Sequence, residues 1–257
     1  MIIEFHKYQA TGNDFIIIDD RDNNFDIHDS ILIQSLCERK MGIGADGLIV
    51  LRNHNEYDFR MIYFNSDGFE STLCGNGARC IVSFANLLDI SSNKIMFMAI
   101  DGMHEASIDD DEVSIKFKDI KKIDYDNKYI IIDSGSPHLV NIVENVDNIN
   151  IDLEGASIRN MPKYKSKGIN VNFIEHDNHI KIRTYERGVE SETLSCGTGA
   201  VASAIALYHS GLIEENIISL ISRGGELSVM FEEFNGIYRN IWLTGSVNLV
   251  YIGEFEC

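Results

Sequence analysis

The chain has 257 residues, of which 44% are hydrophobic and 24% charged, a composition typical of a globular protein with one large domain or two smaller ones. Acidic residues outnumber basic ones by 40 to 22, and the net charge of −18 argues against a nucleic-acid partner, because phosphate binding needs a basic patch. The sequence has no apolar run of about 20 residues and no secretory-signal pattern, so we expect a cytoplasmic protein without a membrane partner.

The first half predicts strands around one buried helix. Residues 2–20 form two strands about a turn at 11–13, and a helix capped by Asp29 or Ser30 and ended by a glycine follows. A strand after that glycine and another at 57–65 lead through a polar turn to Cys74. Residues 78–89 are apolar almost all round, which predicts a buried helix.

The second half repeats this order. Short strands fill 95–135, and the polar run 123–128 is a candidate domain junction. Residues 129–143 predict two strands, and 168–188 predict a hairpin. A second buried helix spans 199–210, with Gly211 as its stop, and alternating strands occupy 218–255.

The five cysteines are too few, and odd in number, for a disulfide framework, and they lack the spacing of a zinc site. Cys37, Cys80 and Cys257 are interpreted as small buried hydrophobic residues. Cys74 and Cys196 instead share the context Cys-Gly-x-Gly before a small, apolar segment. The sequences around them align with one inserted residue, which indicates an internal duplication.

A cysteine at a helix start lies near unpaired N–H groups and a partial positive charge, which lower its pKa and also suit a carboxylate. Two such turns facing each other across a cleft would place two thiols on opposite sides of one carbon. One thiolate would remove an α-proton and the opposite thiol would return one, which inverts an amino-acid stereocentre without a cofactor.

The motifs in order are ATGNDF (10–15), GIGADGL (42–48), FNSDG (64–68), CGNGARC (74–80), GSPH (135–138), GINVNF (168–173), YERG (185–188) and CGTGA (196–200). Across nearly the whole chain they resemble the diaminopimelate epimerase family, within the superfamily of proline racemases and phenazine-biosynthesis-type isomerases. The resemblance implies interconversion of LL- and meso-diaminopimelate in lysine and peptidoglycan precursor biosynthesis, with no pyridoxal phosphate, no metal and a homodimeric assembly.

The resemblance also assigns roles to residues. Cys74 and Cys196 resemble the two acid/base thiols, and His138 and Glu186 resemble groups that tune thiol protonation. The residues that resemble substrate ligands are Asn13, Asn65, Gly75, Asn76, Asn170, Glu186, Arg187, Gly197 and Thr198.

Each assignment has a structural alternative. Asn13 and Asn65 also suit turns, His138 suits a satisfied structural histidine, and Glu186 with Arg187 suits a surface ion pair. The sequence departs from the family pattern at Ser136, where Asn is frequent, and at Gly47, where some members carry Gln. The loop between Glu186 and Cys196 is also one residue longer than in many members.

The implied fold is α+β, with two pseudo-symmetric domains that each wrap a curved mixed sheet around a central helix. We place the domains at 1–119 with 246–257, carrying Cys74, and at 120–245, carrying Cys196. The implied active site lies in the cleft between the two domains.

Three other functions stay open on the residues alone. A racemase for another amino acid, such as proline or histidine, would use the same thiols. A non-catalytic amino-acid-binding protein would use the helix starts without the thiols. A redox protein would join Cys74 and Cys196 in a reversible disulfide, although the sequence has no CxxC motif.

Overall fold

The computed structural model describes residues 2–90 and 94–256, and it divides into two compact units. Unit 1 comprises Met1–Ile115 and Gly245–Cys257, and unit 2 comprises Lys116–Thr244. The chain passes from unit 1 to unit 2 within β7 (Glu112–Phe117) and returns within β16 (Ile237–Ser246). Cys257 lies outside the described residues.

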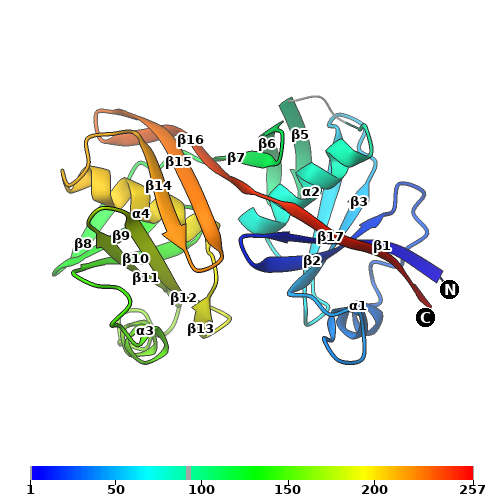
Figure 1. The fold of residues 1–257 in the computed structure, drawn as a ribbon, viewed down its shortest axis with the longest axis horizontal. Coiled ribbons are helices and arrows are strands. Elements are labelled where there is room, and N and C mark those ends of the chain that lie inside the picture. The colour runs from blue at the N-terminus through cyan, green and yellow to red at the C-terminus, as the bar shows by residue number, and fades with distance from the viewer. Residues whose placement is uncertain (1, 91–93, 257) are drawn as a thin grey trace. The chain divides into compact units, whose positions relative to one another are not determined.

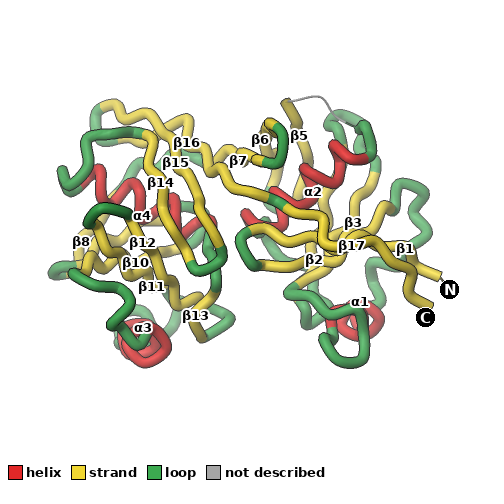
Figure 2. The backbone as a smooth tube through the Cα atoms, viewed as in Figure 1, coloured by secondary structure: helices red, strands yellow, loops and turns green. Residues whose placement is uncertain are grey.

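Strands dominate both units (Figures 1 and 2). The helices are α1 (Ser30–Cys37), α2 (Gly75–Leu87), α3 (Ile151–Arg159) and α4 (Gly197–His209). The strands of the first half are β1 (Ile2–Ala10), β2 (Asn13–Asp19), β3 (Gly47–Arg52), β4 (Phe59–Asn65), β5 (Lys94–Ala99) and β6 (Gly102–Asp109). Those after β7 are β8 (Ile123–Asp126), β9 (Tyr129–Asp133), β10 (Pro137–Val143), β11 (Asn170–His176), β12 (Ile180–Glu186), β13 (Ser191–Thr193), β14 (Ile217–Ser222), β15 (Gly225–Phe234), β16 and β17 (Asn248–Glu256).

The two units use the same pairing scheme. In unit 1, β1–β2 is antiparallel, β2–β3 parallel, β3–β4 antiparallel, β4–β5 parallel and β5–β6 antiparallel. In unit 2 the same alternation runs through β9–β10, β10–β11, β11–β12, β12–β14 and β14–β15. Because parallel neighbours need a crossover, helices join β2 to β3, β4 to β5, β10 to β11 and β12 to β14. This repeated scheme is the structural form of the internal duplication.

The central helices α2 and α4 pack against the strands of their own units (Figure 1). In α4, ten of the 13 residues are buried, and Ala200, Val201 and Ile205 join a core cluster with strands on several sides. The alanine-rich sequence favours a helix that fits closely among strands because Ala combines high helix propensity with little volume. This burial confirms the prediction from an apolar circumference.

Several boundaries differ from the sequence-based expectations. Helix α1 has the expected cap, Asp29, but ends at Cys37 on an extended Glu38 rather than at a glycine. Residues 123–126 form β8, which pairs with β9 inside unit 2, so the run 123–128 belongs to a hairpin and not to a junction. The sequence analysis also missed α3, which is only nine residues long and begins at an Asn150 cap.

Candidate active site

Cys74 lies at the N-cap of α2, after the loop that follows β4. Its backbone is extended (φ −95°, ψ 123°), and its carbonyl accepts the first helical hydrogen bond from Ala78 N at 2.8 Å. Its side chain makes no capping hydrogen bond to the helix. The cysteine therefore lies at the first turn of the helix, where the N–H groups stabilise a negative charge.

Cys196 occupies the same position on α4. It is the N-cap residue with an extended backbone (φ −133°, ψ 110°), its carbonyl accepts from Ala200 N at 2.9 Å, and its side chain also leaves the helix uncapped. Both cysteines are partly buried, whereas Cys37 and Cys80 are buried as predicted. Burial raises the pKa of the Cys37 and Cys80 thiols above the usual range, which leaves Cys74 and Cys196 as the thiols suited to chemistry among the four described cysteines.

Strand register places other candidate residues at equivalent positions in the two units. Phe15 pairs with Gly47 across β2–β3, as His138 pairs with Asn170 across β10–β11. Asn13 lies two residues before Phe15 in unit 1, and Ser136 lies two residues before His138 in unit 2. The two positions that depart from the family pattern, Gly47 and Ser136, are thus each the counterpart of an asparagine in the other unit.

The same reasoning relates two further candidates. Gly47 pairs with Asn65 across β3–β4. In unit 2, Val171 pairs with Tyr185, and one more step along the same register brings Asn170 opposite Glu186. Asn65 and Glu186 therefore end equivalent strands, each before the loop that leads to a cysteine.

Asn13 contacts the Cys74 sulfur, and Asn76 in turn contacts Asn13. Sγ lies 3.6 Å from Asn13 Oδ1, and Asn76 Nδ2 donates to the same oxygen at 3.2 Å. The Asn13 amide is oriented by Asp46, whose carboxylate accepts from Nδ2 at 2.6 Å. Asn65 instead accepts from the Tyr63 hydroxyl at 2.9 Å.

A buried arginine lies beneath this group. Arg79 is fully enclosed, and its Nη2 donates to Asn76 Oδ1 at 2.8 Å and to Thr11 Oγ1 at 3.1 Å. Nε and Nη1 have no hydrogen-bond partner among the described residues, and burial lowers the pKa of the guanidinium to about 10. Burying the charged guanidinium costs desolvation free energy. Its hydrogen bond fixes the orientation of the Asn76 amide, because a guanidinium can only donate.

In unit 2, Thr198 connects Cys196 to His138. Thr198 Oγ1 lies 3.4 Å from Cys196 Sγ and 2.8 Å from His138 Nε2. His138 is fully enclosed, and burial lowers the pKa of its imidazole to about 3, while Asn172 Nδ2 lies 3.0 Å from its Nδ1. The ring is therefore neutral at physiological pH.

A second group forms beside it around Asn170. The Asn170 amide donates to Ser136 Oγ at 2.9 Å and accepts from the Arg187 backbone N–H at 2.8 Å. The Arg187 guanidinium also reaches Ser136 Oγ at 3.1 Å. Glu186 accepts from Thr193 Oγ1 at 2.9 Å.

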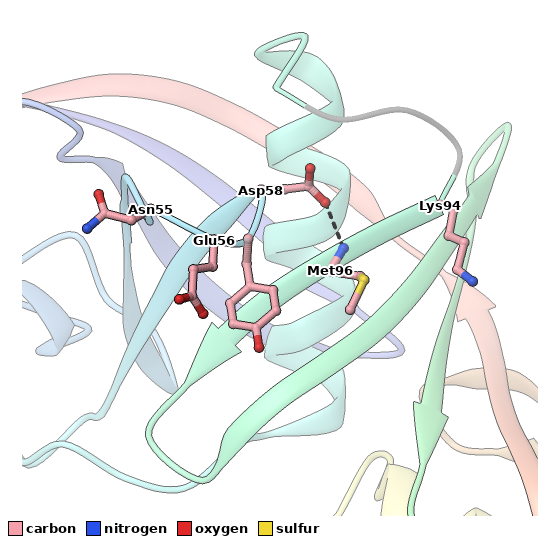
Figure 3. Close-up of a pocket in the computed structure, with 6 residues that line it drawn as sticks. Asn55, Glu56, Asp58, Lys94 and Met96 are labelled. Atoms are coloured by element: carbon pink, nitrogen blue, oxygen red, sulfur yellow. Dashed lines mark hydrogen bonds between the residues drawn. The ribbon is translucent and has the colours of Figure 1, made fainter.

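Surface hollows elsewhere do not involve these residues. One of them, with a volume of about 460 Å³, is lined in unit 1 by Asn55, Glu56, Asp58, Lys94 and Met96 (Figure 3). Asp58 accepts from the Met96 backbone N–H at 2.7 Å there, which ties the loop before β4 to β5. The hollow contains none of the residues singled out from the sequence.

The sequence analysis missed three members of the two groups: Asp46, Arg79 and Asn172. Arg79 carried a signal, because it is a charged residue within an otherwise apolar helix. Asn172 also carried one, because Asn is unfavourable in a buried strand and it alternates with Asn170 on β11.

Solved structures that share this fold include a phenazine biosynthesis protein and a hydroxyproline epimerase. A phenazine biosynthesis protein of the PhzF family from Bacillus anthracis matches with a TM-score of 0.75 at 15% identity, covering 100% of both chains. A hydroxyproline epimerase from Agrobacterium vitis matches with a TM-score of 0.69 at 12% identity, covering 98% of this chain and 92% of that one. Together they define the α+β fold expected from the sequence.

Sequence comparison then gives the family. The family model described as diaminopimelate epimerase matches residues 5–119 and 130–250. The diaminopimelate epimerase of Flavobacterium psychrophilum is 46% identical over 252 residues, covering 97% of this chain and 98% of that protein. That of Aquifex aeolicus is 38% identical, covering 99% and 98%. The chain belongs to the diaminopimelate epimerase family and is an isomerase.

Among residues 2–90 and 94–256, no helix combines the length and apolar character needed to cross a bilayer.

Proposed function

We propose that the chain interconverts LL- and meso-diaminopimelate by acid/base chemistry at Cys74 and Cys196. The observation that carries this proposal is the placement of both cysteines at equivalent helix N-caps, where neither side chain caps its helix. The names and identities of the sequence relatives support diaminopimelate as the substrate.

In the proposed reaction, the thiolate of one cysteine removes the α-proton and the thiol of the other protonates the opposite face of the same carbon. Proton transfer by a positioned group contributes about 10²- to 10⁴-fold to rate. The first N–H groups of α2 and α4, at Gly75–Asn76 and Gly197–Thr198, bind the carboxylate of the reacting centre and stabilise the developing carbanion. The thiol pair supplies both acid and base, so the scheme calls for no cofactor.

The second amino-acid head of the substrate gives Arg187 and the asparagines their roles. The planar guanidinium of Arg187 suits the distal carboxylate, and Glu186 suits an ammonium group. The amides of Asn13, Asn65 and Asn170 supply further donors and acceptors. We place the reaction in lysine and peptidoglycan precursor synthesis in the cytoplasm, catalysed by a homodimer.

The proposal is tested with LL-diaminopimelate in D₂O and reducing buffer, following deuterium uptake at the α-carbon and the stereochemistry of the product. We expect Cys74→Ala or Cys196→Ala to lower the rate at least about 10²-fold, because each removes one proton-transfer group. Cys80→Ala is the matched control, since it removes a buried thiol from α2 and should retain activity. Full activity in either Cys74→Ala or Cys196→Ala would refute the mechanism.

Substrate choice has its own test. Proline, histidine and other amino acids with one stereocentre should exchange their α-proton far more slowly than diaminopimelate. Exchange confined to such amino acids would show that the substrate is wrong while the thiol chemistry is right.

A further inference from the structure

The hydrogen-bond partners of the two sulfur atoms differ in kind. Helix starts are common to both thiols and favour the thiolate at each. The side chains around them are not equivalent, because Cys74 lies against an amide oxygen and Cys196 against a hydroxyl. The direction of each hydrogen bond follows from the groups farther along its chain.

Next to Cys74, the amide orientation is fixed by groups that have only one hydrogen-bonding role. Asp46 carboxylate oxygens accept only, so the amide atom of Asn13 that faces them is Nδ2. Arg79 donates only, so the Asn76 atom facing it is Oδ1, and Asn76 Nδ2 points to Asn13. Asn13 Oδ1 is therefore the atom at the sulfur, and as an acceptor it favours a protonated Cys74 thiol.

Next to Cys196, a longer chain fixes the opposite direction. The Leu139 carbonyl accepts from Asn172 Nδ2 at 3.3 Å, and Asn172 Oδ1 accepts from Thr184 at 2.9 Å. Asn172 Nδ2 consequently faces His138 Nδ1 as a donor at 3.0 Å. A neutral imidazole that accepts at Nδ1 carries its proton on Nε2.

That proton then sets the direction of the last two links. His138 Nε2–H donates to Thr198 Oγ1 at 2.8 Å, and the hydroxyl hydrogen of Thr198 is left to point at Cys196 Sγ, 3.4 Å away. Asn170 Nδ2 also lies 3.4 Å from His138 Nε2, but its two hydrogens are directed to the closer acceptors, Ser136 Oγ at 2.9 Å and the Pro137 carbonyl at 3.2 Å. A hydroxyl donor stabilises a thiolate.

Charges near the two sites act in both directions. Arg79 is electrostatically coupled to Cys74 and favours a thiolate there. The carboxylate of Asp46 lies behind Asn13 and opposes this, although Arg39 partly neutralises it at 2.6 Å. In unit 2, the positive charge of Arg187 acts on His138 and disfavours an imidazolium, which keeps the ring a neutral relay.

We propose that the resting protein holds Cys74 as a thiol and Cys196 as a thiolate, through Asn13 at the first site and the Asn172–His138–Thr198 chain at the second. This inference rests on the proposed two-thiol function, and it makes Asn172 a positioning residue that acts through His138. The free protein is thereby prepared to remove a proton with Cys196 and to deliver one from Cys74. The reverse direction starts from the other protonation pattern, which the same hydrogen bonds disfavour.

The test is alkylation of the full chain by iodoacetamide in reducing buffer across pH 5 to 10, with each cysteine resolved by peptide mass spectrometry. The thiolate reacts, so the pH midpoint of each rate curve reports a thiol pKa independently of how accessible the sulfur is. We expect the Cys196 midpoint to lie at least about one pH unit below that of Cys74, equivalent to a tenfold difference in ionisation ratio.

Variants assign that difference to the hydrogen bonds. Thr198→Val should raise the Cys196 midpoint because it removes the hydroxyl. Thr198→Ser should leave the midpoint near the wild-type value because it keeps the hydroxyl. Ser203→Ala is the matched control, since it removes from the same helix a buried hydroxyl that has no hydrogen-bond partner in the described part of the chain. Asn172→Leu should also raise the Cys196 midpoint, whereas Asn13→Ala should lower that of Cys74.

Equal midpoints, or a lower midpoint at Cys74, would overturn the inference, as would a Thr198→Val protein whose Cys196 midpoint is unchanged. These outcomes are distinct from failure of the proposed function, which is a wild-type protein without α-proton exchange. An active enzyme with reversed midpoints would keep the function and discard this inference.

Discussion

Burial makes His138 a neutral ring whose charge state does not follow its ordinary pKa. The side chain has no exposed surface, and desolvation lowers the pKa of its imidazole to about 3. A histidine in this state serves as a hydrogen-bond relay and not as a proton store at neutral pH. The hydrogen-bonded, buried ring fits the alternative of a satisfied structural histidine, and its contact with Thr198 is the one that the proposed tuning role requires.

This burial gives a pH dependence of stability. Between about pH 6.5, the unfolded value, and about pH 3, the unfolded chain binds a proton at His138 that the folded chain does not. Stability therefore falls as the pH drops through this window, by up to about 1.4 kcal/mol per pH unit from this residue. Urea unfolding of the wild type and His138→Gln between pH 4.5 and 6.5 measures the difference.

The variant should show a shallower dependence of unfolding free energy on pH, because it lacks the titrating ring while all carboxyl groups remain. Parallel pH profiles for the two proteins would contradict the burial argument.

At the level of elements, the start of α4 is packed more tightly than that of α2. A Cβ on Gly199 would lie 2.6 Å from Asn172 Oδ1 and 3.4 Å from Cys196 Sγ. The equivalent Gly77 has its nearest such neighbour, Ile49 Cδ1, at 3.1 Å. Gly199, the second glycine of CGTGA, is therefore required because Asn172 on β11 approaches the helix closely. Gly77, the second glycine of CGNGA, instead faces the flexible end of Ile49.

We expect Gly199→Ala to destabilise the fold by about 1–3 kcal/mol, the usual cost of overpacking a core. It should also displace Asn172 and slow Cys196 alkylation. Gly77→Ala is the matched control and should cost less, because the Ile49 methyl group can move. Urea unfolding midpoints of the two variants test this ranking, and an equal or larger loss in Gly77→Ala would contradict it.

At the level of the whole molecule, the end of the chain completes the unit in which the chain begins. β17 pairs antiparallel with β1 from Ile2↔Glu256 to Gln9↔Asn248, with a register shift between Lys7 and Tyr8. Phe255 packs against a core cluster that contains Ile3 and Phe5. Unit 1 is thus assembled from both ends of the sequence, whereas unit 2 is continuous.

Deletion of residues 247–257 should therefore weaken unit 1 selectively. Hydrogen exchange followed by mass spectrometry should show faster exchange in β1, which loses its β17 partner but keeps β2. Amides of α4 in unit 2 should keep their protection. Equal loss of protection in both units would show that they unfold as one cooperative body.

The sequence alone gave the family, the fold class and the isomerase activity, because the ordered motifs and the duplicated cysteine turns are local in the chain. Long apolar segments and caps such as Asp29 also predicted most strands and three of the helices. These signals are readable because period, capping chemistry and composition act over a few neighbouring residues.

Tertiary structure decided what depends on distant segments. One series of hydrogen bonds joins four separate elements through Thr184, Asn172, His138 and Thr198. The direction of these hydrogen bonds follows from the Leu139 carbonyl on β10. In the sequence, Arg79 is a charged residue in a largely apolar helix. Folding places Thr11, from a distant turn, at the same Nη2 atom that Asn76 of the helix accepts from. Hydrogen bonds have direction and burial sets charge, and neither is defined until the strands bring their partners together.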